Sequence, residues 1–361
     1  MPRSPFNPAN FLERFVAVQI RAAALVVVAA VAGVLSATIG DLEIHNDASK
    51  FISDVAIGGF FLLVGLELRR EIANGTLSGQ MLRIATVAAG AGILGPALIF
   101  ILFAPSGVRD GWVAVVATDI ALATAITALG RFRPVLRTML ITIAVLDDIG
   151  GIAALATTGK SPKMLYALAV VAVVVFFAWS IRKFNFGVFY TIAACTLSVV
   201  LMLRADLHPS LGAFAIGMVV PHFDPDNPSV AERVEERIHP WIAAVLLPIF
   251  VFLHTLVPLR IPNYAPASLV VITGLAILVG KTIGIGGTLF VVRRRLDIQP
   301  SEALAIGLAS AAAMTVALIG VAASIRGTQY VEVVSLGVLA ATAIAFILGI
   351  VAGRSRSESF R

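Results

Sequence analysis

Five ionisable side chains interrupt long apolar runs in this sequence: Glu67, Asp119, Asp147, Asp148 and Lys281. Each costs roughly 2.5 to 3.5 kcal/mol at the centre of a membrane helix. Together they cost on the order of 15 kcal/mol, which is comparable with the net stability of a whole protein. Charge at this depth is typical of an ion or proton pathway. The alternative is a set of buried ion pairs that only fix helix packing, although three central acids and one lysine leave charge uncompensated.

The adjacent acids Asp147 and Asp148 point about 100° apart on a helix. One carboxylate can therefore line an aqueous cavity while the other meets Lys281. Burial favours the neutral forms and pairing favours the charged ones, so such a site can titrate near physiological pH. Carboxylate and hydroxyl oxygens are also hard ligands that suit a small alkali cation. Glu67 is followed by two arginines near the end of its run, so a helix-end ion pair explains it as well as a functional role does.

The apolar runs around these charges predict an all-α polytopic membrane protein. Of 361 residues, 59% are hydrophobic and 13% charged, with a mean hydropathy of +0.96. A soluble globule of this size cannot bury so much apolar surface. Runs of about twenty apolar residues can cross roughly 30 Å of hydrocarbon. Twelve transmembrane helices are expected, at approximately 22–39, 51–68, 84–103, 112–129, 138–157, 164–181, 187–203, 210–221, 240–257, 267–291, 303–324 and 334–352.

Basic residues predict the orientation of these helices. When the connections alternate between sides, 19 of the 27 Lys and Arg residues share the side of the N-terminus, 7 lie opposite, and Lys281 lies within a span. This bias places both termini in the cytoplasm. We expect one integral membrane domain over 1–361, with a cytoplasmic N-terminal segment at 1–21 and a cytoplasmic tail at 353–361. The net charge of +6 does not indicate nucleic-acid binding, because the basic residues occupy short connections rather than one face.

A short pattern recurs in two expected spans that run in opposite directions. Residues 117–122 (ATDIAL) and 313–318 (AMTVAL) place small and polar residues in similar apolar company. Two discontinuous helices in an inverted repeat would expose free N–H and C=O groups at the midplane, where Asp119 could neutralise positive helix ends and Lys281 negative ones. Two unbroken, alanine-rich packing helices are the alternative.

Several stretches resemble the NhaA family of bacterial sodium/proton antiporters. They are FFLLVGLELRRE (60–71), ATDIALA (117–123), LDDIGGI (146–152), LHPSLGAFAIGMVVP (207–221), ERIHPW (236–241) and GKTIG (280–284), and they occur in family order across nearly the whole chain. The family is an established example of inverted-topology repeats with two discontinuous, crossing helices. The resemblance implies that fold here.

The resemblance also implies roles for individual residues. Asp148 matches the essential carboxylate that binds Na⁺ and exchanges protons, and Asp147 matches a neighbouring acid that lines the site and pairs with Lys281. Thr118 and Asp119 match the crossing of the discontinuous helices. Positions linked to the pH response are matched by Glu67, Arg70, Glu71, His208, Arg233 and Glu236, although a simple loop histidine also explains His208.

The chain departs from the family pattern in two places that bear on structure. Family members carry a β-hairpin between the first two spans that is used for dimer contact, whereas this chain has only about ten residues there (GDLEIHNDAS), so a homodimer would need another contact. Ala311, Ala312 and Ala313 replace the glycine-rich break of the eleventh span, which weakens the expectation that this span unwinds.

These features predict a secondary active transporter of the bacterial inner membrane. It would exchange cytoplasmic Na⁺, and also Li⁺, for external H⁺, driven by the proton gradient, and serve pH and sodium homeostasis. No Walker-type loop is present and no cofactor is expected, while the single cysteine, Cys195, excludes an intrachain disulfide. An intramembrane aspartyl protease would need a G-x-G-D context that is missing. A sodium-coupled solute or organic-anion symporter of similar fold is the remaining alternative.

Overall fold

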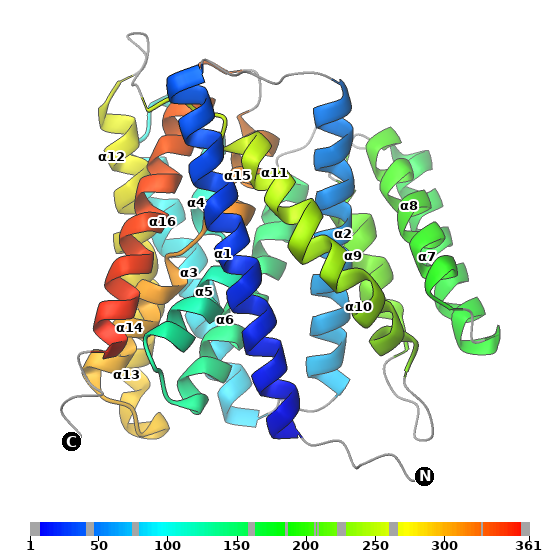
Figure 1. Cartoon of the computed structure of the whole chain (residues 1–361), viewed down its shortest axis with the longest axis horizontal. Helices are drawn as coiled ribbons and strands as arrows, with labels where there is room; N and C mark the ends of the chain where they lie inside the picture. The colour runs from blue at the N-terminus through cyan, green and yellow to red at the C-terminus, as the bar shows by residue number, and fades with distance from the viewer. Residues whose placement is uncertain are drawn as a thin grey trace.

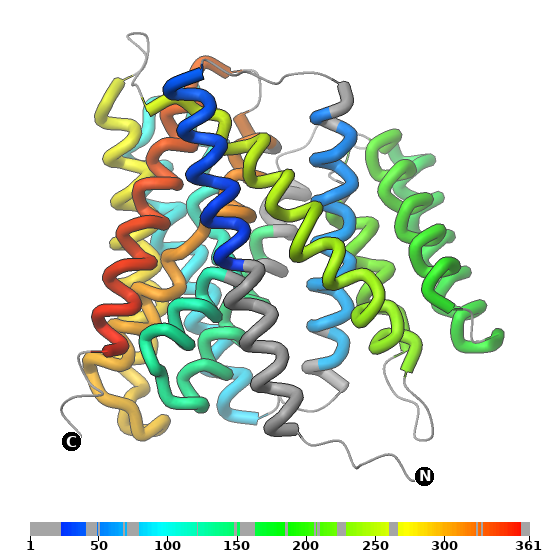
Figure 2. The backbone as a smooth tube through the Cα atoms, viewed as in Figure 1, coloured from blue at the N-terminus to red at the C-terminus, as the bar shows by residue number. Residues whose placement is uncertain are grey.

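The computed structural model describes a helical chain (Figure 1), whose backbone path is traced in Figure 2. The described residues are 8–40, 47–73, 79–157, 163–184, 187–205, 207, 209–221, 229–259, 266–325 and 328–354. Within these ranges every regular element is an α-, 3₁₀- or π-helix and no strand occurs. The predicted all-α class is therefore confirmed for the described part of the chain. The shortened connection at 41–46 lies outside it.

The helices follow the order of the apolar runs. The uninterrupted ones are α1 (Pro8–Gly40), α2 (Asp47–Ala73), α3 (Gly79–Phe103), α6 (Pro134–Thr157), α7 (Met164–Phe184), α8 (Val188–Arg204), α9 (Pro209–Val219) and α16 (Val331–Arg354). Two composite helices contain π-helical turns: α10 (Val230–Trp241), η2 (Ile242–Leu246) and α11 (Leu247–His254) form one, and α12 (Ser268–Leu275), η3 (Ala276–Gly280), η4 (Thr282–Gly286) and α13 (Gly287–Leu296) form the other. A 3₁₀-helix, η1 (Ser106–Gly111), precedes α4.

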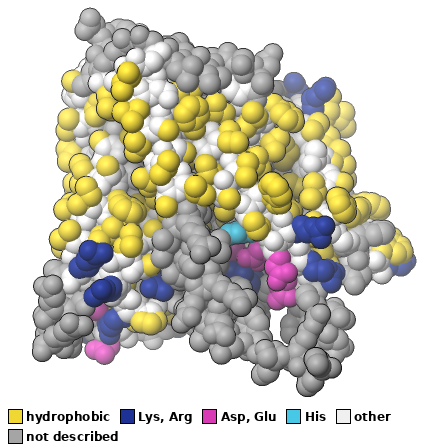
Figure 3. Space-filling model, viewed as in Figure 1, with side chains coloured by type: hydrophobic (Ala, Val, Ile, Leu, Met, Phe, Trp, Pro, Cys, Tyr) yellow, Lys and Arg dark blue, Asp and Glu magenta, His cyan; other side chains and the backbone are white. Residues whose placement is uncertain are grey.

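The outer surface of the bundle is apolar. Figure 3 shows hydrophobic side chains over its middle and upper parts, while most charged side chains on this face lie towards the lower edge and some Lys and Arg atoms lie at the upper right. By length and composition, six helical segments among the described residues can cross a membrane, or seven if the bent pair α14 and α15 counts as one. A helical protein with such an exterior is stable only where lipid covers it. The chain is therefore a multi-pass membrane protein, and the count of twelve spans stays a prediction.

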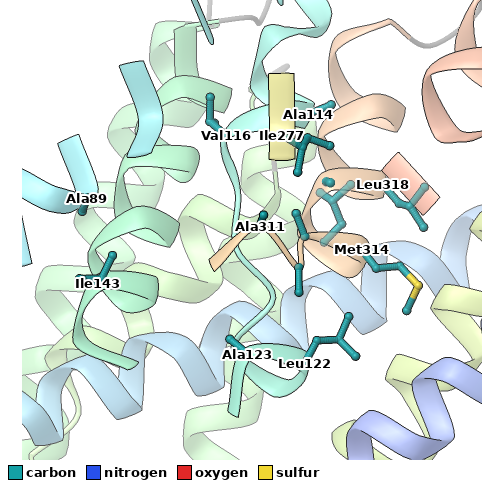
Figure 4. Packing of buried hydrophobic residues seen from close by; sticks show 14 of the residues in the cluster. Ala89, Ala114, Val116, Leu122, Ala123, Ile143, Ile277, Ala311, Met314 and Leu318 are labelled. Atoms are coloured by element: carbon teal, nitrogen blue, oxygen red, sulfur yellow. The ribbon is translucent and has the colours of Figure 1, made fainter. Parts of the chain in front are cut away.

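Two helices are interrupted at the recurring pattern. The first consists of α4 (Trp112–Val116) and α5 (Ile120–Leu129), with an extended segment at 117–119. The second consists of α14 (Pro300–Ser310) and α15 (Met314–Ser324), bent by 44°. In Figure 4 Ala311 lies beside the extended chain that runs from Val116 to Leu122. The backbone N–H of Asp119 donates to the carbonyl of Ala312 (2.7 Å), so the two interruptions contact each other.

The alanine-rich interruption does not need glycine. Ala311 and Ala313 have φ values of −79° and −134°, which any residue adopts. The sequence left open whether this span is broken, and the structure interrupts it at residues 311–313 without glycine. A second link between the two interrupted helices lies at one end of the bundle, where Arg133, just after α5, makes a bidentate salt bridge to Glu302 of α14 (both N···O distances 2.8 Å).

Helix α3 packs unusually closely on the composite helix that carries Lys281. A Cβ atom at Gly280 would lie 2.5 Å from the backbone of Pro96, and one at Gly284 would overlap the carbonyl oxygen of Ala91. Small residues allow such backbone approach between membrane helices. Lys281 lies between the π-helical turns η3 and η4, so the glycines on either side of it fix its position against α3.

The close approach predicts the effect of adding one methyl group. Gly284→Ala should lower the melting temperature in detergent, because the new Cβ meets backbone that cannot move aside; overpacking of this kind costs about 1–3 kcal/mol. Gly287→Ala is the matched control on the same helix, since nothing lies within 4 Å of its Cβ position. The control should be neutral or slightly stabilised through helix propensity. Equal melting temperatures for the two variants would contradict the packing described above.

Candidate functional site

Asp119 joins the starts of two helices. Its backbone is extended, and Oδ1 accepts a hydrogen bond from the N–H of Leu122 (3.1 Å), so it is the N-cap of α5. Its other oxygen, Oδ2, accepts from the backbone N–H of Thr315 (3.1 Å) and from the Thr315 hydroxyl, both in the first turn of α15. One buried carboxylate therefore neutralises the positive ends of two helices.

Thr315 and Asp119 occupy equivalent positions in the two recurring segments, 313–318 and 117–122. In the aligned pattern ATDIAL and AMTVAL, Asp119 and Thr315 are both third. The internal repeat therefore contained a signal for this contact, although the sequence alone did not identify Thr315. Equivalent positions of two inverted segments can meet on the axis that relates them.

Next to this contact, three side chains from three elements form a second cluster. Thr118 comes from the interruption after α4, Asp147 from α6, and Lys281 from the junction of η3 and η4. Lys281 Nζ donates to Thr118 Oγ1 (2.7 Å) and to Asp147 Oδ2. All three residues have 0% exposure. The predicted pairing of Asp147 with Lys281 is thus present in the structure, with Thr118 as an additional partner.

The hydroxyl of Thr118 has one proton and two acceptors within reach. Its Oγ1 lies 2.6 Å from Asp147 Oδ2 and 3.0 Å from the carbonyl oxygen of Ser310, the last residue of α14. Lys281 reaches the same hydroxyl, so the ammonium group lies near the negative end of α14 through Thr118. Ser310 was not anticipated, because the pattern of the sequence does not reveal backbone acceptors.

The second oxygen of Asp147 lacks a partner. Asp147 Oδ1 is buried and makes no hydrogen bond to any described residue. It faces Gly92 of α3, 3.8 Å from where a Cβ atom would lie. A buried acceptor without a donor costs free energy unless a proton, a cation or water satisfies it. Asp147 Oδ1 is therefore the one carboxylate oxygen of the described cluster that no described donor satisfies.

Asp148 follows Asp147 in α6, but its side chain lies outside the described residues. Among described side chains, no group of three or more His, Cys, Asp or Glu is arranged to hold a metal ion.

The residues matched to the pH response occupy the ends of α2 and α10. Arg70 lies 3.7 Å from Glu67 and makes a bidentate contact with Glu235 of α10 (2.9 and 3.1 Å). Glu67 therefore takes part in the helix-end ion pair weighed as an alternative. Arg233 and Glu236 also lie on α10, and Glu235 joins this helix to Arg70 of α2. The side chain of Glu71 and the whole of His208 lie outside the described residues.

Comparisons with known protein families and with individual proteins find similarity to one class of protein, the Na⁺/H⁺ antiporters. The family model described as Na⁺/H⁺ antiporter 1 matches residues 28–352. The chain is 33% identical to the Na⁺/H⁺ antiporter NhaA of Serratia proteamaculans over 258 residues (68% of this chain) and 33% identical to that of Yersinia enterocolitica over 265 residues (70%). Each match spans 66% of the relative's length, slightly less than two thirds.

The fold resembles that of a solved antiporter. The structure of the sodium proton antiporter MjNhaP1 from Methanocaldococcus jannaschii at pH 8 superimposes with a TM-score of 0.59 and 13% identity. The match covers 92% of this chain and 90% of that one.

The double cap at Asp119 predicts a specific stability effect. Thr315→Val keeps the shape of the side chain but removes the hydroxyl donor to a buried carboxylate, and we expect it to lower the free energy of unfolding by about 1–2 kcal/mol. Thr315→Ser retains the donor and is the matched control. Thermal unfolding in detergent measures both. A valine variant as stable as the serine variant would show that the hydroxyl contributes nothing.

Proposed function

The chain belongs to the Na⁺/H⁺ antiporter 1 family, and from this membership we propose that it exchanges cytoplasmic Na⁺, and also Li⁺, for external H⁺ across the bacterial inner membrane. The proton gradient supplies the energy, and the exchange serves pH and sodium homeostasis. Its relatives are named as Na⁺/H⁺ antiporters, which are transporters rather than enzymes. The described residues contain no feature that favours a symporter, so antiport is the function proposed.

The observation that carries this proposal is the buried cluster of Thr118, Asp147 and Lys281, in which one carboxylate oxygen has no partner. In the absence of Na⁺ the ammonium group of Lys281 compensates the charge of Asp147. A cation that binds the oxygens of Asp147 and Asp148 would compete with that ammonium, because two positive charges at this distance repel in a medium of low dielectric. Na⁺ binding therefore favours loss of protons from the site, and protonation favours loss of Na⁺.

Exchange requires that binding of the two ions be mutually exclusive. Protons on Asp148, or on the Asp147–Lys281 pair, remove the negative charge that holds Na⁺. If more than one proton leaves for each Na⁺ bound, the exchange is electrogenic. No cofactor takes part: binding of either ion favours release of the other, and the proton gradient sets the direction of exchange.

We propose that twelve spans carry this site, arranged as inverted repeats with two discontinuous, crossing helices. The interruptions at 117–119 and 311–313 and the hydrogen bond from Asp119 to Ala312 support this arrangement. The free helix ends there present backbone dipoles to the ions, and one rearrangement of the repeats would open the site alternately to each side.

We further propose that both termini face the cytoplasm. Figure 1 shows that the start of α1 and the end of α16 lie at the same edge of the bundle. This is the edge towards which charged side chains gather in Figure 3, and an excess of Lys and Arg is typical of cytoplasmic connections. Arg70 and Glu67, with Arg233 and Glu236 nearby, would then lie at the cytoplasmic entrance, where cytoplasmic pH can act on them. A homodimer stays a prediction.

The central test is exchange in everted membrane vesicles. Addition of Na⁺ should collapse an imposed proton gradient, reported by a pH-sensitive dye, with the unmodified protein but not with Asp148→Asn, because an amide neither holds Na⁺ by charge nor exchanges a proton. Asp110→Asn, the same substitution at an exposed aspartate, is the control and should behave as the unmodified protein. Equal responses from Asp148→Asn and its control would disprove the assignment of the site.

We expect Lys281 to determine the pH range in which exchange occurs, and we do not expect exchange itself to require this lysine. Lys281→Ala leaves Asp147 without a compensating cation, so protons should compete with Na⁺ up to a higher pH, and the activity profile should move towards alkaline pH. Asp147→Asn in the same chain should reverse much of that displacement, since the uncompensated charge is gone. Dye fluorescence at a series of pH values measures the profile. Lys183→Ala, at an exposed lysine of α7, should leave the profile unchanged.

A further inference from the structure

A cavity of about 660 Å³ lies between the start of α3 and helix α13, and its described lining includes none of Thr118, Asp147 and Lys281. Its polar lining consists of Gln80 and Arg83 from α3 and Thr288 and Arg295 from α13. Among the described residues that line it, none is acidic. The cavity lies where α3 begins and α13 ends.

The two arginines that line this cavity carry positive charge and have no partner among the described residues. Arg83 and Arg295 are exposed, and neither makes a salt bridge or hydrogen bond within the described part of the chain. The hydroxyl of Thr288 already donates to the carbonyl of Gly284 (2.7 Å), so it can only accept. Two guanidinium groups and the amide of Gln80 therefore remain to bind a ligand. Such a set suits an oxyanion, and phosphate accepts two parallel hydrogen bonds from arginine.

The surface next to these arginines is apolar. Val87 lines the cavity and is 63% exposed, and Leu94 (62%) and Leu98 (55%) follow on the same face of α3. On the other wall, Val291 of α13 is 78% exposed and Val292 lines the cavity. These side chains face hydrocarbon. A soluble phosphate would use the two arginines but leave this adjoining apolar surface unused.

From these observations we propose that the cavity between α3 and α13 binds one anionic phospholipid, with the headgroup phosphate between Arg83 and Arg295 and the acyl chains along Val87, Leu94 and Leu98. Basic pockets between membrane helices on the cytoplasmic side recognise such headgroups. The bound phosphate also separates two like charges that face one cavity, so it stabilises the contact of α3 with α13. This inference does not depend on the transported ion.

The test measures phosphatidylglycerol binding to the purified full chain in detergent. Native mass spectrometry counts retained lipid molecules, and the melting temperature reports stabilisation during titration. The unmodified protein should retain one lipid more than Arg83→Gln/Arg295→Gln and should melt at a higher temperature with lipid. The double variant should bind at least tenfold more weakly at this site. Arg294→Gln, at an exposed arginine of α13 that does not line the cavity, should match the unmodified protein.

Three further measurements make the proposal falsifiable. Phosphatidylcholine with the same acyl chains should not reproduce the effect, and Arg83→Lys/Arg295→Lys should retain most of it because the charge remains. Glycerol 3-phosphate at the same concentration should not bind; equal affinity for it would mean a site for a soluble phosphate and would overturn the lipid assignment. Equal lipid retention by the unmodified protein and the glutamine double variant would overturn the site itself. The single Arg295→Gln variant gives the same comparison should the double variant not purify.

Discussion

The structure depends on one constraint, which is that an interrupted helix within hydrocarbon must find partners for its free backbone groups. Water is absent there, and each unsatisfied N–H or C=O costs several kcal/mol. The chain meets this demand by placing its two interruptions against each other. The carboxylate of Asp119 accepts from the starts of α5 and α15, and its own N–H donates to Ala312. The same interruption that exposes these groups brings Thr118 to Lys281.

The site therefore follows from the need to stabilise broken helices. Thr118 and Asp119 are neighbours in an extended segment, so their side chains point in different directions. Asp119 completes the helix starts, while Thr118 bridges Asp147, Lys281 and the end of α14. Asp119 holds the two helix starts together, and Thr118 belongs to the buried cluster with Asp147 and Lys281. This separation explains why two adjacent polar residues serve the two purposes without competing for the same partners.

The sequence predicted those features that depend on composition and periodicity. The apolar runs predicted where helices lie, and the cost of buried charge singled out Asp119, Asp147 and Lys281 before any contact was known. The sequence could not predict contacts that depend on how each helix is rotated about its own axis. Nothing in the order of residues distinguishes Glu235 from Glu236, yet the register of α10 turns Glu235 towards Arg70. The π-helical turns beside Lys281 were missed too, because they change the number of residues per turn without any marker in composition.

The backbone contact between α3 and the helix of Lys281 limits how the molecule can move. Surfaces that meet through glycines, with carbonyl oxygens against Cα atoms, interlock and cannot slide past each other without losing contact along their whole length. This packing couples the two helices, so that a movement of one would have to carry the other. A conformational change around the buried ammonium group of Lys281 would therefore have to tilt both helices together or rearrange the walls around them.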